Sequence, residues 1–388
     1  MTKEKKLELI SRIVLFFIIF ISIIVGIFVQ FANSTVYLIL NILTAMIILF
    51  YIIMKLKNKD LKINMFLMLT VLLIFLGTYF RTEKEILYST SLIIILLSYY
   101  AISVANVSDK LLNYISLIIS SAIIPTVIIN GIFNSNIIAG TSFSGRLNPF
   151  MYFPYLVIAL VYNEKNKAIT IFIKFEIILL FIDILWSESR AALMALVFFS
   201  VMYILFNKKD HNILNSRKKA ILKILLLGLI IIQIILPRIY ILLFKNYAVQ
   251  LNTISYNWTG KYFFSGRQRV WERMNDVLEG NKKWGTGDVQ YKKQLQAPHN
   301  EFMNLYYCWG IFVALSIYVY LYSIGRRCIE KSRTKIDLII ILSFLSTIIC
   351  TIFETYIYAI HFYIFNNLLV AYLLNKKIEG EKIDEQIS

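Results

Sequence analysis

Runs of about twenty apolar residues recur along this 388-residue chain and decide what it can fold into. Of its residues 59% are hydrophobic and 16% are charged, whereas soluble domains carry about 25% charged residues. Backbone polar groups find no water partner inside lipid, so segments of this kind cross a bilayer as helices. The sequence therefore predicts an all-α, polytopic membrane protein.

Twelve runs are expected to be membrane spans. They cover residues 9–30, 36–54, 63–80, 86–105, 111–133, 149–162, 168–187, 191–206, 220–241, 302–323, 336–354 and 356–374. The first run is too long for a signal-peptide core and is expected to be retained. Lys and Arg gather in alternate connections, which places both termini in the cytoplasm. The same rule explains the net charge of +17 without a nucleic-acid partner.

The spans divide the chain into three parts: nine spans in residues 1–244, one large extracytoplasmic helical loop in 245–300, and three spans with a cytoplasmic tail in 301–388. The loop holds nine Lys and Arg against four Asp and Glu. External loops are usually poor in Lys and Arg. Two interpretations stay open, a site for an anionic ligand and a basic surface resting on anionic headgroups.

A short amphipathic helix is predicted inside this loop, from Arg267 to Leu278, with Ser265 as its N-cap and Gly280 as the residue that ends it. Its apolar face consists of Val270, Met274, Val277 and Leu278, with Trp271 at the edge, and its polar face presents Arg267, Arg269 and Arg273. Cations are disfavoured in a first helical turn. The position of Arg267 therefore indicates a bound anion. Residues 284–289 then form a glycine-rich turn.

His299 is the candidate general base. It follows Pro298 and precedes Asn300 and Glu301, where the tenth span begins at the outer boundary. Neighbouring cations favour a neutral ring, and a neutral imidazole can accept a proton from a hydroxyl. The other two histidines are expected to be solvated (His211) or hydrogen-bonded within the last span (His361).

Two further arginines, Arg146 and Arg190, lie in other predicted outer loops. Each either snorkels at the interface or binds a diphosphate, whose oxygens suit the arginine fork. In the seventh span, Lys174 is expected to snorkel toward the inner face and Asp183 to be a satisfied polar group near the outer end.

Several classes of protein are excluded. The three cysteines form no CxxC, no His/Cys cluster suits zinc, and no Walker or GxGxxG motif is present. The sequence therefore predicts neither a metal nor a cofactor.

Seven short features carry a family resemblance: SerGlyArg at 265–267, Trp271, the Gly285–Gly287 turn, HisAsn at 299–300, Gly310, SESRAAL at 187–193 and SGRLNPF at 144–150. Their order resembles the O-antigen ligase and polymerase family, bacterial polytopic proteins of the Wzy type, over residues 140–325. The resemblance implies a metal-independent glycosyltransferase that uses undecaprenyl-diphosphate-linked sugars at the outer face of the cytoplasmic membrane.

The resemblance also implies roles for individual residues. His299 matches the base, and Arg190, Arg267 and Arg146 match arginines that bind the donor diphosphate. We add Arg269 to that set from its place in the basic loop, with Arg273, Asn300 and Glu301 as supporting residues. Expected partners are the lipid-linked glycan donor and acceptor, membrane lipids and a chain-length regulator.

The expected activity is polymerisation of repeat units into O-antigen, capsular or exopolysaccharide, with inversion. One alternative is a ligase, which moves the glycan to a lipid A core by the same chemistry. Another is a polysaccharide flippase or secondary transporter, although such a protein would concentrate charged groups at mid-membrane. A peptidoglycan-type polymerase would use a comparable donor, and the sequence shows no acidic motif for it.

Overall fold

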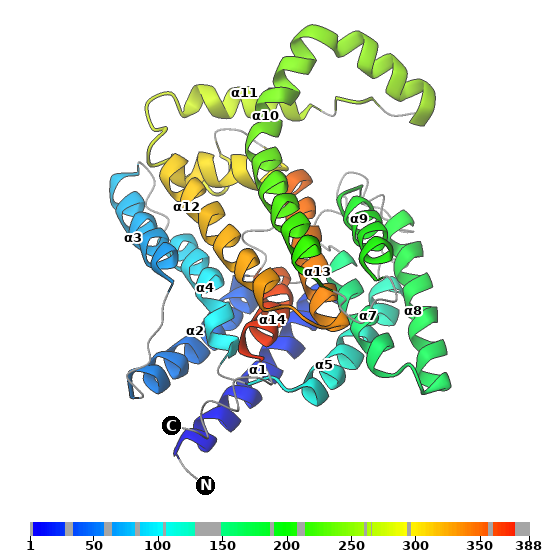
Figure 1. The fold of residues 1–388 in the computed structure, drawn as a ribbon. Helices are drawn as coiled ribbons and strands as arrows, with labels where there is room; N and C mark the ends of the chain where they lie inside the picture. The colour runs from blue at the N-terminus through cyan, green and yellow to red at the C-terminus, as the bar shows by residue number, and fades with distance from the viewer. Residues whose placement is uncertain are drawn as a thin grey trace.

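The computed structural model describes residues 3–27, 34–57, 64–81, 86–103, 106–128, 149–186, 190–207, 214–259, 262–264, 266–292, 296–355 and 360–376. Within these ranges the chain is helical and contains no strand (Figure 1). The elements are α1 Lys3–Ile27, α2 Ser34–Lys57, α3 Met65–Phe80, α4 Ile86–Ser103, α5 Asp109–Ser121, the 3₁₀ helix η3 Pro149–Tyr152, α7 Phe153–Tyr162, α8 Lys167–Trp186, α9 Arg190–Phe206, α10 Ser216–Thr259, α11 Arg267–Val277, α12 Glu301–Lys331, α13 Lys335–Phe353 and α14 Ile360–Asn375.

Every predicted apolar run contains helix, which confirms the all-helical fold class. Among the residues that the structure describes, five helical stretches could cross a membrane by length and composition: Lys5–Ile24, Asp109–Ile128, Ser216–Trp258, Glu301–Lys331 and Lys335–Phe353. Five shorter apolar helices accompany them: Leu38–Phe50, Met65–Phe80, Ile86–Ser98, Phe150–Tyr162 and Arg190–Phe206. These findings fit a helical membrane protein, and the full count of twelve spans stays a prediction.

The centre of the bundle is α13. It is apolar on all sides, as a fully enclosed helix must be, and 89% of its apolar stretch is buried, against 28% for α10. The helices α7, α9, α10, α12 and α14 pack around it. The helix α13 runs from one end of the bundle to the other (Figure 1). The residues that follow Phe353 are therefore anchored to a helix that is packed on all sides.

Two helices extend further than the sequence indicated. The ninth run was expected to end near residue 241, yet α10 continues to Thr259 through Pro237 and bends at Tyr247 (φ −135°, ψ 21°). The part of the predicted loop from Lys245 to Thr259 is therefore helix. Likewise α12 reaches Lys331 and is interrupted at Gly310 (φ 80°, ψ 174°). Polar side chains after residue 241 looked like a loop, but a helix that leaves the bundle can carry them on all sides.

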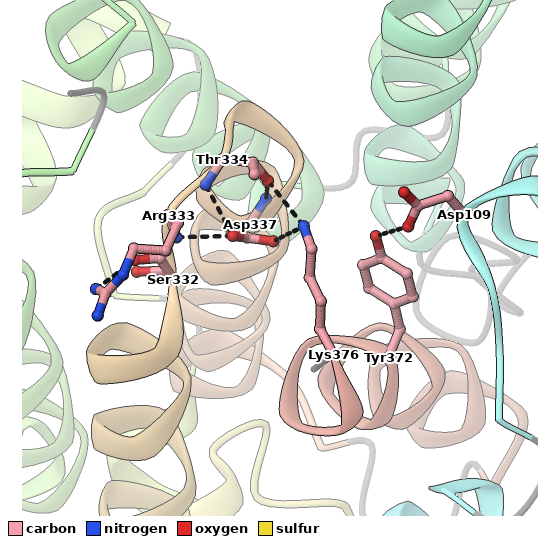
Figure 2. A network of polar contacts seen from close by, with 7 residues as sticks. All are labelled: Asp109, Ser332, Arg333, Thr334, Asp337, Tyr372 and Lys376. Atoms are coloured by element: carbon pink, nitrogen blue, oxygen red, sulfur yellow. Dashed lines mark hydrogen bonds and ion pairs between the residues drawn. The ribbon is translucent and has the colours of Figure 1, made fainter. Parts of the chain in front are cut away.

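The end of the bundle where α13 begins is closed by a polar network (Figure 2). Thr334 and Asp337 form a capping box at the start of α13. Lys376, just beyond α14, places its Nζ atom 3.3 Å from Oδ1 of Asp337. Nearby, the hydroxyl of Tyr372 on α14 donates to the carboxylate of Asp109 on α5. These contacts join α5, α13 and α14. The candidate site lies at the opposite end of α13.

Candidate functional site

A histidine, a glutamate and an arginine meet at the end of the bundle where α13 stops. Nδ1 of His299 lies 2.7 Å from Oε2 of Glu354, and Nη2 of Arg267 lies 3.5 Å from Oε1 of the same carboxylate. The side chains of His299, Glu354 and Arg267 are 45%, 20% and 27% exposed, so a ligand can reach all three. The structure thus brings His299 and Arg267 together through a carboxylate between them.

The backbone at His299 is fixed on both sides. On one side, Nε1 of Trp271 donates to the carbonyl of Pro298 at 2.6 Å. On the other, Asn300 caps α12 by accepting from the N–H of Met303 at 2.9 Å, and its Nδ2 donates to the carbonyl of Ile352 at 3.0 Å. Between these anchors His299 adopts a left-handed conformation with φ 49°. Such a conformation persists where its surroundings hold it and is common at functional sites.

Two of the three predicted supporting residues, Asn300 and Glu301, are buried. Asn300 ties the start of α12 to the last turn of α13, so its contribution is to place the His299 ring against Glu354. Glu301 lines an internal cavity of about 50 Å³ between α4, α10, α12, α13 and α14. That volume has room for a few water molecules and none for a sugar.

Arg267 is the first residue of α11, which lies across the end of the bundle on α10 and α12 (Figure 1). Gly266 precedes it at φ 86° and makes no side-chain cap, while Ser265, the predicted N-cap, lies outside the described residues. The anion that we expected beside this first-turn cation is, within the chain, the carboxylate of Glu354. Arg269 and Arg273 follow on the exposed face of α11.

Two details of the predicted loop helix were wrong. Trp271 is not at the edge of the apolar face; it is 2% exposed, and its ring lies 5.2 Å from that of Tyr240 on α10. An indole with a hydrogen-bond partner can be buried completely, which the helix pattern alone did not reveal. Gly280 does not end the helix, because α11 stops at Val277 and Leu278 stays right-handed (φ −75°, ψ −9°).

The glycine-rich turn does more than reverse the chain. The N–H groups of Thr286 and Gly287 donate to the carbonyls of Tyr307 and Cys308, both at 2.9 Å, and the N–H of Ile311 donates to the carbonyl of Lys282 at 3.0 Å. The turn therefore satisfies the backbone groups that the break in α12 leaves free. Irregular backbone inside a membrane protein needs partners of this kind.

This backbone crossing requires glycine on both sides. A Cβ atom on Gly285 would lie 2.5 Å from the nitrogen of Gly310, and one on Gly310 would lie 2.2 Å from the carbonyl oxygen of Lys283. Both residues also have positive φ, 75° and 80°, a region open to glycine at low cost. The spacing of His299 and Gly310 in the sequence thus has a physical reason. The turn of residues 282–287 holds the part of α12 that lies between the histidine and Gly310.

Side chains hold the same segment on the bundle. The ring of Trp284 stacks on Phe80 of α3 at 5.3 Å. Two hydrogen bonds join the loop to α12: the hydroxyl of Tyr307 donates to Oδ2 of Asp288 at 3.0 Å, and that of Tyr291 donates to Oδ1 of Asn304 at 2.7 Å. Burial raises the pKa of Tyr291 well above its usual value, which keeps the phenol protonated as a donor. These contacts fix the loop against α3 and α12.

Arg190 begins α9 and lies at the same end of the bundle. The carbonyl of the next residue, Ala191, is 3.8 Å from Sγ of Cys350, one turn before Glu354 on α13. The guanidinium group of Arg190 is exposed and makes no hydrogen bond or ion pair with any part of the chain that the structure describes. Arg146 and His211 lie outside the described residues, and for His361 only the backbone in α14 is described.

Sequence reasoning missed Glu354. It lies 55 residues from His299 and closes the predicted span 336–354, and no role was predicted for it. The available signal was a carboxylate at the outer end of an apolar run, on the side predicted for His299. The expected surroundings of the ring need a correction as well: its direct partner is this carboxylate, and the guanidinium lies beyond it.

The arrangement resembles the way proteins prepare an imidazole for proton transfer. With the carboxylate as acceptor, Nδ1 carries the hydrogen, and Nε2 keeps its lone pair for a proton. A carboxylate in this position also stabilises the charged ring that forms after the proton arrives. Within the described ranges, no three His, Cys, Asp or Glu side chains gather as metal ligands would. The site can therefore remove a proton beside a cation that attracts an anionic group.

Comparisons with known proteins give no relative for this chain. No protein-family model matches the sequence, and neither a curated protein nor a solved structure is similar to it.

Proposed function

We propose that the protein is a glycosyltransferase that polymerises undecaprenyl-diphosphate-linked repeat units into O-antigen, capsular or exopolysaccharide. The observation that carries this proposal is the meeting of His299 and Arg267 at one carboxylate, Glu354. These residues come from three different elements, and two of them belong to the motifs that resemble the ligase and polymerase family. A general base next to a cation is what transfer from a lipid diphosphate needs.

In the proposed reaction, a hydroxyl of the acceptor sugar attacks the anomeric carbon of the donor. Nε2 of His299 takes the hydroxyl proton as the new glycosidic bond forms. The bond from the anomeric carbon to the diphosphate breaks, and the lipid diphosphate leaves with its electron pair. Direct displacement inverts the anomeric centre. Glu354 acts through the imidazole, which it orients and whose positive charge it stabilises.

The leaving diphosphate gains negative charge, which arginines stabilise when they are already in place. Arg267 contacts Glu354 at 3.5 Å, a looser contact than the 2.7 Å bond between His299 and Glu354. A diphosphate can therefore engage its guanidinium while the histidine stays bound. Arg190 and Arg269 are exposed at the same end of the bundle and complete the proposed set, together with Arg146.

We further propose the twelve-span topology, with both termini in the cytoplasm of a bacterial cell and His299 at the outer face of the cytoplasmic membrane. The abundance of Lys and Arg near the start of α13, and in the other connections predicted to be internal, supports this orientation. It places the donor, which is presented on the outer leaflet, beside the loop of residues 266–300.

The test is the glycan profile of a deletion strain complemented with full-length variants. His299→Ala should leave mainly single lipid-linked repeats in the outer leaflet and only a small residual amount of polymer. Arg326→Ala removes an exposed cation at the other end of α12 and should restore polymer. Near-normal polymer from the histidine variant would remove it as the base. Repeats trapped in the inner leaflet would instead indicate a flippase, and complete polymer that stays unattached to lipid A core would indicate a ligase.

A further inference from the structure

A second candidate site lies at the end of the bundle opposite His299, and it does not depend on the proposed reaction. A groove of about 440 Å³ runs between α7, α8 and α9 and reaches the first residue of α13. Its size is within the usual range for ligand pockets. Its wall combines aromatic and aliphatic side chains with three charged ones, Glu164, Lys174 and Lys335.

The floor of the groove is aromatic and rigid. Phe199 of α9 lies 5.1 Å from Phe153 of α7, edge to face, and stacks on Tyr203 at 6.1 Å. Phe153 and Phe199 are buried, and Ile204 at the rim is 72% exposed. An open groove with an apolar floor in a membrane helix bundle suits a hydrocarbon chain.

The three charged side chains make no hydrogen bond or ion pair with the described portions of the chain. Lys174 is on α8, seven residues or about 10 Å beyond Lys167, so it stands deeper than the end of its helix. Lys335 starts α13, where the helix dipole adds positive potential. A lysine that only snorkels needs no shared cavity, whereas here lysines from two helices line one groove.

We propose that this groove binds an anionic phospholipid of the phosphatidylglycerol type from the adjacent leaflet. Its phosphate lies between Lys174 and Lys335, its headgroup hydroxyls donate to Glu164, and one acyl chain covers Phe199. Two lysines and one glutamate give the groove a net charge of +1, which matches the single negative charge of this lipid. Basic pockets between membrane helices on the cytoplasmic side recognise anionic headgroups in this way.

The experiment uses the full-length protein in nanodiscs of phosphatidylcholine, with phosphatidylglycerol titrated in and thermal unfolding as the readout. Phosphatidylglycerol should raise the unfolding temperature of the wild type. Lys174→Ala and Lys335→Ala should each weaken the apparent affinity by roughly fivefold, and the double variant should abolish the effect. Lys167→Ala removes the same charge from α8 outside the groove and should behave as the wild type.

Equal losses in the Lys167 and Lys174 variants would overturn the proposal, because they would show general attraction to charged lipid. An equal shift on adding more phosphatidylcholine would overturn it as well. Native mass spectrometry of the gently extracted protein gives an independent readout. Retained phosphatidylglycerol that the double variant loses supports the proposal, and a lipid diphosphate retained in its place contradicts it.

Discussion

The two ends of α13 use the same chemistry for different purposes. At its start, Asp337 is 1% exposed and accepts from the N–H groups of Arg333 and Thr334 at 2.7 and 2.8 Å, with Lys376 3.3 Å away. Beyond its end, Glu354 is 20% exposed and faces a histidine that is 45% exposed. The carboxylate of Asp337 is buried, and its oxygens are occupied by contacts within the fold. The carboxylate of Glu354 is held in place but open to a ligand, which is the arrangement that a reactive site needs.

The largest expected effect on stability concerns the backbone crossing between Gly310 of α12 and the glycine-rich turn. Gly310→Ala places a Cβ atom 2.2 Å from the carbonyl oxygen of Lys283, so the turn and α12 must separate. We expect destabilisation by more than about 4 kcal/mol and little folded protein in the membrane, measured by accumulation and thermal unfolding. Gly228→Ala in α10 is the matched control, since a Cβ atom there would meet nothing within 4 Å apart from the adjoining backbone of its own helix. Normal accumulation of the Gly310 variant would show that the crossing is dispensable.

The second largest effect is expected at the start of α13, where the carboxylate of Asp337 is buried. Asp337→Ala removes the capping box and leaves two partly buried N–H groups without their acceptor, at a cost of about 3 kcal/mol. Glu354→Ala should change the unfolding temperature much less, because its carboxylate is partly solvated. Thermal unfolding of both variants in the same detergent checks the difference. Equal losses of stability in the two variants would contradict the claim that Asp337 stabilises the fold more than Glu354 does.

A smaller change in free energy is expected from Glu354→Gln, and it should appear in activity. The amide keeps the shape of the side chain but loses the charge that stabilises a protonated His299. We expect polymer formation to slow by about a hundredfold, with normal protein levels. The rate of polymer formation in membranes, divided by the amount of protein, is the measurement. A rate within a few fold of the wild type would show that the carboxylate has only a structural part.

The smallest effect is expected at the anchor behind the histidine. Trp271→Phe keeps most of the buried ring but loses the hydrogen bond to the carbonyl of Pro298, worth about 1 kcal/mol. Polymer formation should fall by roughly fivefold at a similar protein level, since 1 kcal/mol corresponds to about that factor. Trp258→Phe is the control, because that side chain is 87% exposed. If both variants are equally active, the anchor does not position His299.

The helices could be predicted from the sequence because each apolar run must satisfy its own backbone in lipid. The continuation of α10 could not, since Lys245, Asn246 and Gln250 resemble a loop wherever no packing partner is visible. The break at Gly310 also stayed hidden. A glycine within an apolar run becomes a kink only when another backbone segment, here residues 282–287, approaches and supplies the missing hydrogen bonds.

The candidate site was predictable in part for a related reason. The motif order indicated His299 and Arg267, because both residues belong to short motifs in the polar loop of residues 245–300. Glu354 closes a predicted span, and a carboxylate there has many ordinary explanations; only the antiparallel course of α12 and α13 brings it to the ring. The bond from Trp271 to Pro298 was equally out of reach, because it depends on the angle at which α11 crosses the bundle.

The central claim is that His299 and Glu354 act as one unit in proton transfer. A double-mutant cycle on the rate of polymer formation, with His299→Ala, Glu354→Gln and the double variant in purified membranes, tests it most directly. Residues that act together lose their effect together, so the double variant should be no slower than His299→Ala alone. If the two losses instead multiply, the glutamate acts independently of the histidine and the account is wrong.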